Sequence, residues 1–262
     1  MIQYYDVRGE KIACWIKRSD FDAGQKNLFF IHGSGGGHHL WVNQYGRLHK
    51  KFNIVAVNLP GHAPSGGRGE NDVRRYSDWI RETLDAVGWK KSILVGHSLG
   101  AAIALTSALD YPDKLAGIVC VGGGMKMPVN AFFLEFLQSA PAAIPAEIVE
   151  LITKFSLAKE NRARLSPPLQ LSIAQAKVDV MYGDLFACNN LDLTQEAGDI
   201  GIPALIVCGT QDKMTPPELS RALAAAMVDA RLVFIEGAGH MVMLEQPEKF
   251  NAVLTDFVSG LP

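Results

Sequence analysis

The chain has 262 residues, of which 48% are hydrophobic and 20% charged, and its formal net charge is −2. This length and composition predict one large globular domain, or one domain that carries an insertion. The nearly balanced charge, without a basic block, argues against a nucleic-acid partner and against binding to an anionic membrane.

The first part of the chain predicts a β-hairpin that leads into a buried strand. Residues 3–7 and 12–17 flank a short turn, and residues 20–26 predict a polar loop. Residues 27–31 are almost wholly apolar and predict the first central strand. The N-terminus lacks a positive region followed by an apolar run, and no apolar stretch could span a bilayer. We therefore expect a cytoplasmic protein without a signal peptide or a membrane anchor.

A glycine-rich loop, residues 32–39, directly follows this strand. Acyl transfer needs two N–H donors aimed at one oxyanion, and a loop of this kind supplies one of them. We expect that donor to be Ser34, with Gly35 as the neighbouring alternative. A phosphate-binding loop is excluded because the G-x-G-x-x-G spacing fails and no P-loop lysine follows. The loop histidines have no carboxylate or cysteine at ligand spacing nearby, so we predict no metal site and a packing role for His32.

The next elements alternate between helix and strand, as is typical of α/β proteins. The pattern predicts a short helix at 40–50, a strand at 53–58, a turn-rich loop at 59–67 and a helix at 73–87 that ends at Gly88.

The next stretch, residues 93–109, combines a strand, a tight turn and a helix. Residues 93–95 predict a buried strand, and residues 101–109 predict a helix. Between them lies Gly-His-Ser-Leu-Gly, residues 96–100, which has the form of a nucleophile elbow. The turn is so sharp that Ser98 must adopt a strained backbone, and side chains in place of the two glycines would collide. The hydroxyl of Ser98 then stands at a helix N-terminus, where developing negative charge is stabilised.

After a strand at 115–121 the alternating rhythm stops, and no further strand is predicted until about residue 193. Helices are predicted at 131–137, 146–155 and 169–182, with prolines between them at Pro128, Pro141, Pro145, Pro167 and Pro168. We interpret residues 125–193 as a helical lid, because a connection of this length is unusual. Additional crossover helices of the core are the alternative. An apolar underside of this lid would be formed by Met125, Met127, Phe132, Phe133 and Phe136.

The rhythm resumes with a strand at 203–208, a helix at 217–227, a strand at 230–235 and a final helix at 241–258. Asp212 follows the first of these strands and His240 follows the second. Loops after parallel strands emerge at one edge of the sheet, where the elbow also emerges. We therefore expect Ser98, Asp212 and His240 to converge.

The chemistry assigns a role to each of these residues. His240 would take the proton of Ser98 and pass it to the leaving group, and Asp212 would fix the tautomer of His240. The amides of Leu99 and Ser34 would bind the oxyanion. For Asp212 the alternative is a turn or helix-cap role, and His240 has a similar one, but their joint placement favours catalysis.

Together these motifs resemble the α/β-hydrolase superfamily, in particular its small, lidded, esterase-like members. The resemblance rests on the oxyanion loop at 32–36, the Leu-Pro-Gly-His turn at 59–62, the elbow at 95–101, the acid loop at 208–216 and the histidine loop at 237–241. Asn58 stands where the family usually has Asp, and residues 63–65 replace its usual Gly-x-Ser, but neither site is catalytic.

The resemblance implies a mostly parallel eight-stranded sheet flanked by helices, with a core of residues 1–124 and 194–262 and a lid at 125–193. It implies a serine hydrolase that cleaves a carboxylic ester or thioester through an acyl-enzyme. The substrate would be a small molecule, no cofactor or metal is needed, and the chain would be a monomer or a homodimer. We expect the substrate to contact Gly35, His97, Met125 and Phe133.

Alternatives on the same fold are a C–C bond hydrolase acting on a dienone acid, a lyase of the menaquinone-pathway type, and a non-catalytic receptor that retains the triad. The first two bind anionic substrates, for which Arg162 and Arg164 are candidate ligands, although surface solvation is their alternative role. The four cysteines are Cys14, Cys120, Cys188 and Cys208, with no C-x-x-C pair, and we expect them to be free and buried.

Overall fold

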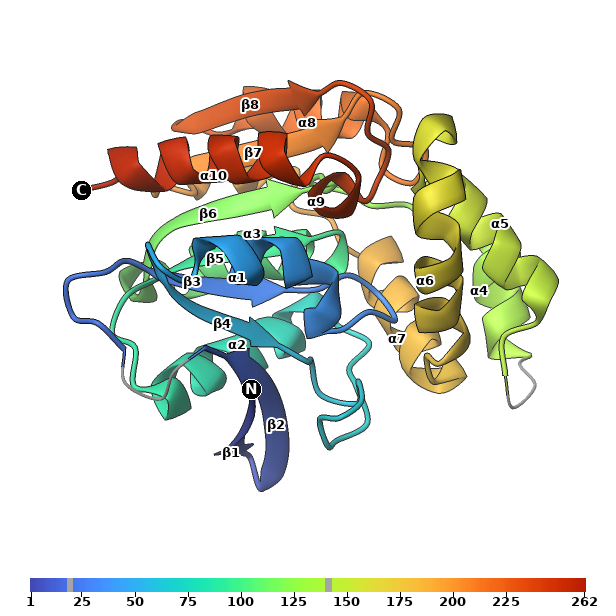
Figure 1. The fold of residues 1–262 in the computed structure, drawn as a ribbon, viewed down its shortest axis with the longest axis horizontal. Coiled ribbons are helices and arrows are strands. Elements are labelled where there is room, and N and C mark those ends of the chain that lie inside the picture. The colour runs from blue at the N-terminus through green and yellow to red at the C-terminus, as the bar shows by residue number, and fades with distance from the viewer. Residues whose placement is uncertain (18–20, 140–142) are drawn as a thin grey trace.

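A single eight-stranded sheet forms the centre of the molecule (Figure 1). The computed structural model describes residues 1–17, 21–139 and 143–262. The spatial order of the strands is β1-β2-β4-β3-β5-β6-β7-β8, and all pairs are parallel except β1 with β2 and β2 with β4. The predicted sheet is therefore confirmed. Its strands are β1 (Ile2–Val7), β2 (Glu10–Ile16), β3 (Asn27–Ile31), β4 (Asn53–Val57), β5 (Ser92–His97), β6 (Leu115–Val121), β7 (Ala204–Gly209) and β8 (Ala230–Ile235).

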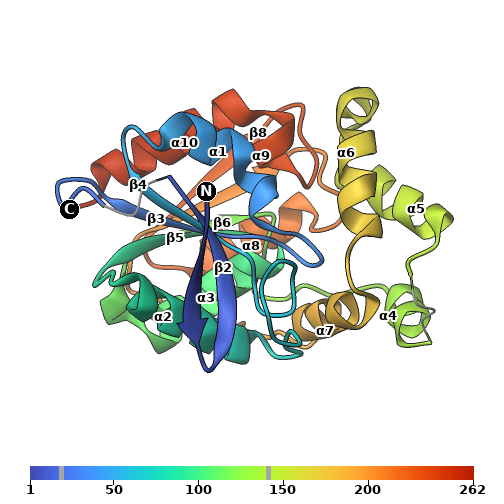
Figure 2. The same cartoon turned by 60° about the horizontal axis from the view of Figure 1, so that its bottom comes forward.

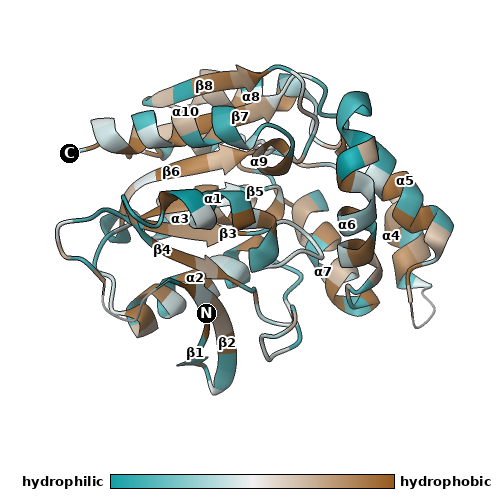
Figure 3. Cartoon of the chain, viewed as in Figure 1, coloured by the Kyte–Doolittle hydropathy of each residue, from teal (hydrophilic) through white to brown (hydrophobic). Residues whose placement is uncertain are grey.

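Helices cover both faces of the sheet, which explains why the central strands are apolar throughout rather than alternating. One face packs against α1 (Val42–Leu48), α9 (Val242–Glu245) and α10 (Pro247–Gly260), and the other against α2 (Val73–Val87), α3 (Leu99–Asp110) and α8 (Pro217–Ala226) (Figures 1 and 2). Colouring by hydropathy shows the same division, with apolar strands inside and polar residues on the outer helix surfaces (Figure 3). No helix of the described residues has both the length and the apolar character needed to cross a bilayer.

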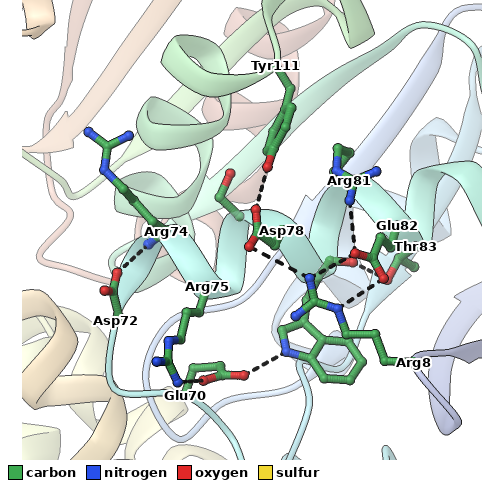
Figure 4. Close-up of polar contacts among 12 residues, drawn as sticks. Arg8, Glu70, Asp72, Arg74, Arg75, Asp78, Arg81, Glu82, Thr83 and Tyr111 are labelled. Carbon is green, nitrogen blue, oxygen red and sulfur yellow. Dashed lines mark hydrogen bonds and ion pairs between the residues drawn. The ribbon is translucent and has the colours of Figure 1, made fainter.

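Helix α2 shows how local sequence signals set an element and attach it to the sheet (Figure 4). Asp72 caps its start by accepting a hydrogen bond from the amide of Arg74, and Gly88 ends it in the left-handed conformation, with φ of 83°. The guanidinium of Arg8, between β1 and β2, donates to Glu82 at 2.8 Å. The N-terminal hairpin is thereby attached to the helix that covers it.

The described residues of the segment 125–193 form four α-helices at the carboxyl ends of the parallel strands (Figures 1 and 2). They are α4 (Ala131–Gln138), α5 (Ala146–Ser156), α6 (Arg162–Ala174) and α7 (Val178–Asn189). Lys126 and Asp192 pair in an antiparallel bridge and form an ion pair of 3.0 Å between Nζ and Oδ2. The two ends of this segment, which we call the inserted helices, therefore meet where it joins the sheet.

Two predicted helices are wrong in their extent. The helix predicted at 169–182 is divided between α6 and α7, and Lys177 between them is extended. Pro167 and Pro168 do not interrupt α6, in which both lie at exposed positions. The helix predicted at 241–258 breaks at Gln246, since a residue before a proline avoids the helical conformation.

The remaining predicted elements agree with the structure to within a few residues, except that the helix predicted at 40–50 is a 3₁₀ turn followed by α1. Pro141 and the first residue of the predicted loop at 20–26 lie outside the described residues. All four cysteines are free and buried, as predicted.

Candidate active site

The elbow has the geometry that its glycines predict. Ser98 adopts a φ of 54° and a ψ of −116°, a conformation that is strained for a residue with a side chain. A Cβ atom on Gly96 would lie 1.9 Å from the carbonyl oxygen of Gly100, and one on Gly100 would lie 2.3 Å from that of Ile31. Neither position has room for a side chain. The two glycines are therefore required by packing around the Ser98 turn.

Asp212 and His240 form a buried pair at the ends of β7 and β8. Nδ1 of His240 lies 2.8 Å from Oδ2 of Asp212, and both residues are almost fully buried. Burial alone raises the pKa of Asp212, but His240 and the hydrogen bonds from Thr215 outweigh it and hold that pKa below its usual value. The carboxylate is thus ionised at neutral pH and able to fix the tautomer of His240.

Ser98 and His240 line the same cavity. Within the described residues no hydrogen bond joins the hydroxyl of Ser98 to the ring of His240. Contacts of this kind are often long without substrate and shorten when it binds. Gly122, which follows the carboxyl end of β6, leaves space for the ring of His240, because a Cβ atom on this glycine would lie 2.9 Å from Nδ1 of that ring.

The hydrogen bonds of the oxyanion loop distinguish between Ser34 and Gly35, the two candidate donors that the sequence leaves open. The amide of Gly35 donates to Oδ2 of Asp184 at 2.9 Å, so it is already occupied. The amides of Ser34 and Leu99 have no acceptor among the described residues, and Ser34 lines the cavity. The structure therefore favours Ser34 over Gly35. His32 has the packing role predicted for it, since its Nε2 accepts a hydrogen bond from the amide of Leu59.

His97, which the sequence predicts as a substrate contact, also lines the cavity. Its Nε2 donates to the carbonyl oxygen of His240 at 3.1 Å, and its Nδ1 is buried without a partner. Burial lowers the pKa of His97 to about 3, so the ring is neutral at physiological pH. A neutral ring next to His240 adds no positive charge that would oppose formation of an imidazolium there.

The cavity above Ser98 has a volume of about 350 Å³ and is mostly apolar. Gly35 and Phe133 line it as predicted, but Met125 does not. Met125 packs instead against the core on the α3 side of the sheet, and Met127 takes its place in the wall. The other apolar wall residues are Leu40, Pro128, Val129, Ile152, Phe155, Leu169, Ile173, Met181, Leu185, Cys188, Met214 and Met241.

The charged residues of this cavity are few. Lys213 is the one lysine or arginine among the described residues that line it, and none of them is acidic. Arg162 and Arg164, the predicted candidates for an anionic substrate, do not line it. Arg162 donates to the carbonyls of Lys154 and Leu157, and Arg164 to those of residues 244 and 245. Both arginines therefore bind backbone groups next to the site.

Three polar residues to which the sequence assigned no role hold the loops that carry Ser34, Asp212 and His240. Thr215 donates to Asp212 from both its amide and its hydroxyl, each at 2.9 Å. Glu245 is buried and accepts from the amides of Gly239 and Met241, which flank His240. Asp184 binds the oxyanion loop. A helix-cap pattern at Asp212-x-x-Thr215 was a readable signal, whereas the other two depend on contacts between distant segments.

The comparison with families decides the assignment of the fold. The sequence model of the "Alpha/beta hydrolase family" matches residues 28–253. The chain belongs to the alpha/beta hydrolase family. The family, the fold class and the enzyme class predicted from the sequence are confirmed, and the chain is an esterase-like hydrolase of this family.

Individual relatives of this hydrolase match along nearly their whole length. A protein of Enterobacter cloacae subsp. cloacae that carries the name of a carbamate hydrolase, RutD, is 28% identical over 250 residues, which cover 91% of this chain and 93% of that protein. The pimeloyl-(acyl-carrier protein) methyl ester esterase of Neisseria meningitidis serogroup B is 27% identical over 262 residues. This match covers 93% of this chain and 97% of that esterase. A solved thermophilic esterase is 30% identical, with a TM-score of 0.84 and coverage of 100% and 99%.

Proposed function

We propose that this hydrolase cleaves carboxylic esters or thioesters through an acyl-enzyme on Ser98. The observation that carries the proposal is the buried Asp212–His240 pair, whose histidine lines the same cavity as a strained serine at a helix N-terminus. His240 removes the proton of Ser98 as the hydroxyl oxygen attacks the acyl carbon, and then gives that proton to the leaving alcohol or thiol. A water activated by His240 releases the acid.

Charge develops on the acyl oxygen during each attack. The amides of Leu99 and Ser34 are the proposed donors to this oxyanion, and the N-terminus of α3 adds a favourable dipole. Thr215 keeps the Asp212 carboxylate ionised and in place while His240 is positively charged. Because His97 is neutral, it does not repel the positive charge on His240.

The cavity suggests the kind of substrate. Its volume of about 350 Å³ lies at the small end of the range of roughly 300–1,000 Å³ for ligand pockets, and its wall is mainly apolar. A neutral acyl group of short to medium length suits such a wall. The names of the two relatives that act on a methyl ester and on esters support ester chemistry. A small-molecule substrate, a cytoplasmic location and a monomer or homodimer remain predictions.

The inserted helices are proposed to act as the lid over this cavity. Phe133 from α4, Ile152 from α5, Ile173 from α6 and Met181 from α7 all contribute to its wall. The lid would therefore decide which acyl groups fit. Cleavage of an anionic dienone acid is less well supported, because Arg162 and Arg164 are engaged with backbone carbonyls outside the cavity.

A panel of p-nitrophenyl esters with acyl chains of two to twelve carbons tests the proposal. We expect turnover by the wild type with a preference for the shorter chains, and a loss of turnover in Ser98→Ala by about 10⁴-fold or more. Ser139→Ala, which changes an exposed serine at the end of α4, is the matched control and should keep wild-type activity. Equal turnover in the wild type and Ser98→Ala would refute the acyl-enzyme, and a wild type without turnover would favour a receptor.

A further inference from the structure

A second buried carboxylate lies beside the oxyanion loop. Asp184, on α7, has a fully buried side chain. Its oxygens accept hydrogen bonds from three segments that are distant in sequence, namely the amide of Gly35 at 2.9 Å, Nε2 of His62 at 2.9 Å and the hydroxyl of Tyr76 at 2.6 Å. Burying a carboxylate is costly unless such donors surround it. The three donors therefore offset the cost of burying the Asp184 carboxylate.

His62 is the partner of Asp184 in the loop after β4. Burial alone lowers the pKa of His62, but the Asp184 carboxylate opposes that effect and the pKa is raised overall. The ring also lies next to His32, with centroids 4.7 Å apart, at the foot of the oxyanion loop. The pair of His62 and Asp184 thus joins the loop after β4 to a helix of the inserted segment, directly beneath the loop after β3.

The hydrogen bond from the Gly35 amide to Asp184 lies within a tight turn of the oxyanion loop. The amide of Gly36 donates to the carbonyl of Gly33 at 3.0 Å, which closes a β-turn with Ser34 and Gly35 at its centre. Gly35 has a φ of 63°, in keeping with the third residue of a type II turn. Type I and type II turns differ in the orientation of their central peptide, which here carries the Gly35 amide. Asp184 holds that amide, and therefore that orientation.

One face of α7 packs on this turn. Met181, Asp184 and Cys188 are spaced by three and four residues and so lie on the same side of the helix. Met181 and Cys188 line the cavity, and a Cβ atom on Gly35 would lie 2.3 Å from Cε of Met181. Helix α7 therefore contacts both the wall that meets the substrate and the turn that carries Ser34.

We propose that Asp184 is a positioning residue of the oxyanion hole, which fixes the Ser34–Gly35 peptide and so holds the Ser34 amide beside the cavity. The inserted segment thereby contributes to transition-state stabilisation as well as to substrate choice. This inference rests on the proposed function, because it assigns Asp184 to the oxyanion step of the same reaction.

The first test compares Asp184→Asn with Asp179→Asn, which makes the same change at an exposed position of the same helix. With a p-nitrophenyl butyrate assay, we expect Asp184→Asn to lower kcat by about 10–100-fold while KM changes less than threefold. A trifluoromethyl ketone, which forms an oxyanion when Ser98 adds to its carbonyl, should bind more weakly by the same factor as kcat falls. Asp179→Asn should match the wild type in all three measurements.

Tyr76→Phe separates positioning from simple stability, because it removes a donor to Asp184 without touching Gly35. We expect it to lower Tm while kcat stays within about threefold of the wild type. If Asp184→Asn and Tyr76→Phe lose kcat in equal proportion to their loss of Tm, the role of Asp184 is structural and the proposal is wrong. Asn keeps one oxygen that can accept from Gly35, so Asp184→Ala is the stricter variant: it removes the acceptor of the Gly35 amide and places no new donor against it.

Amide exchange at Gly35, measured by NMR on glycine-labelled protein, tests the inference without any substrate. The hydrogen bond predicts protection in the wild type and in Asp179→Asn, and exchange at least tenfold faster in Asp184→Ala, which has no acceptor at this position. Fast exchange in the wild type, or unchanged exchange in Asp184→Ala, would overturn the proposal even if the enzyme hydrolyses esters. Protection that is lost as expected, in a protein without esterase activity, would leave the positioning intact and reject the proposed function instead.

Discussion

Asp212 accepts four hydrogen bonds, and only one of them comes from His240. The others come from the amides of Met214 and Thr215 and from the hydroxyl of Thr215. A carboxylate with this many donors stays ionised in spite of its burial and has little freedom to rotate. At the scale of the residue, the role that we propose for Asp212 is to present a fixed negative charge to one nitrogen of His240.

The substitution Asp212→Asn tests that function. The amide would favour the wrong tautomer of His240, so we expect kcat for the ester assay to fall by about 10³–10⁴-fold with little change in KM. Asp199→Asn, at an exposed position outside the cavity lining, should leave both constants unchanged. A tenfold or smaller loss of kcat in Asp212→Asn would show that another group orients His240.

His97 makes the stability of the fold depend on pH. Burial lowers its pKa to about 3, whereas the unfolded chain should protonate it near pH 6.5. Between these values the unfolded state binds a proton that the folded state does not. The contribution of neutral His97 to the free energy of unfolding is therefore complete above about pH 6.5. It is lost as the pH falls toward 3, by about 1.4 kcal/mol per pH unit for this one group.

Urea unfolding between pH 4 and 6.5 measures this dependence. We predict a shallower slope of unfolding free energy against pH in His97→Asn than in the wild type. Thr106→Val, which also removes a buried polar atom without a partner but does not titrate, should keep the wild-type slope. An unchanged slope in His97→Asn would mean that the ring is protonated in the folded protein.

At the scale of the element, the junction of β5 and α3 is the tightest point of the chain. The backbone of Gly100 fills the space where a Cβ atom of Gly96 would lie, and the end of β3 does the same for Gly100. Strand, turn and helix are thus locked against one another, and this rigidity keeps Ser98 in its strained conformation.

A pair of glycine substitutions tests this rigidity. Gly96→Ala should reduce the free energy of unfolding by about 3 kcal/mol or more, because its methyl group meets backbone atoms that cannot move aside. Gly46→Ala, inside α1 with open space around it, should instead raise stability by about 0.5–1 kcal/mol. Denaturation by urea reports both, and wild-type stability in Gly96→Ala would show that the turn relaxes more easily than its contacts imply.

At the scale of the whole molecule, the inserted helices are attached to the catalytic loops by polar contacts as well as by apolar packing. The carbonyl of Ser156 accepts the amide of His240 at 2.9 Å, and Glu245 accepts the amide of Ala158 at 2.8 Å. Asp184 binds the oxyanion loop on the other side of the cavity. Helices α5 and α7 are therefore attached to the loops of the site on two sides of the cavity, and α4 contributes Phe133 to its wall.

Two adjacent phenylalanines of α4 test this view of substrate choice. Phe133 lines the cavity, whereas Phe132 is 55% exposed. We expect Phe133→Ala to shift the preferred acyl chain of the ester panel toward longer chains, because it enlarges the cavity. Phe132→Ala should leave the preference unchanged. The same chain-length profile in both variants would argue that α4 is not a wall for the acyl group.

The sequence predicted the sheet and the elbow well, because buried parallel strands and crowded glycines follow from local rules. Ser98, Asp212 and His240 were predicted as site residues from their places after strands of one sheet, and two of them, Ser98 and His240, line one cavity. The corner between α6 and α7 was missed because apolar side chains continue across it toward the same cavity. Asp184 and Glu245 could not be found, since their partners lie far away in the sequence and only the fold brings them together.

Mass spectrometry of the intact protein, quenched during turnover of p-nitrophenyl butyrate, tests the central claim most directly. The account predicts a mass increase equal to one butyryl group, located by digestion on Ser98, which accumulates further in His240→Ala if that variant still reacts and never forms in Ser98→Ala. Ester turnover with no acyl adduct on Ser98 at any quench time, or an adduct on another residue, would contradict it.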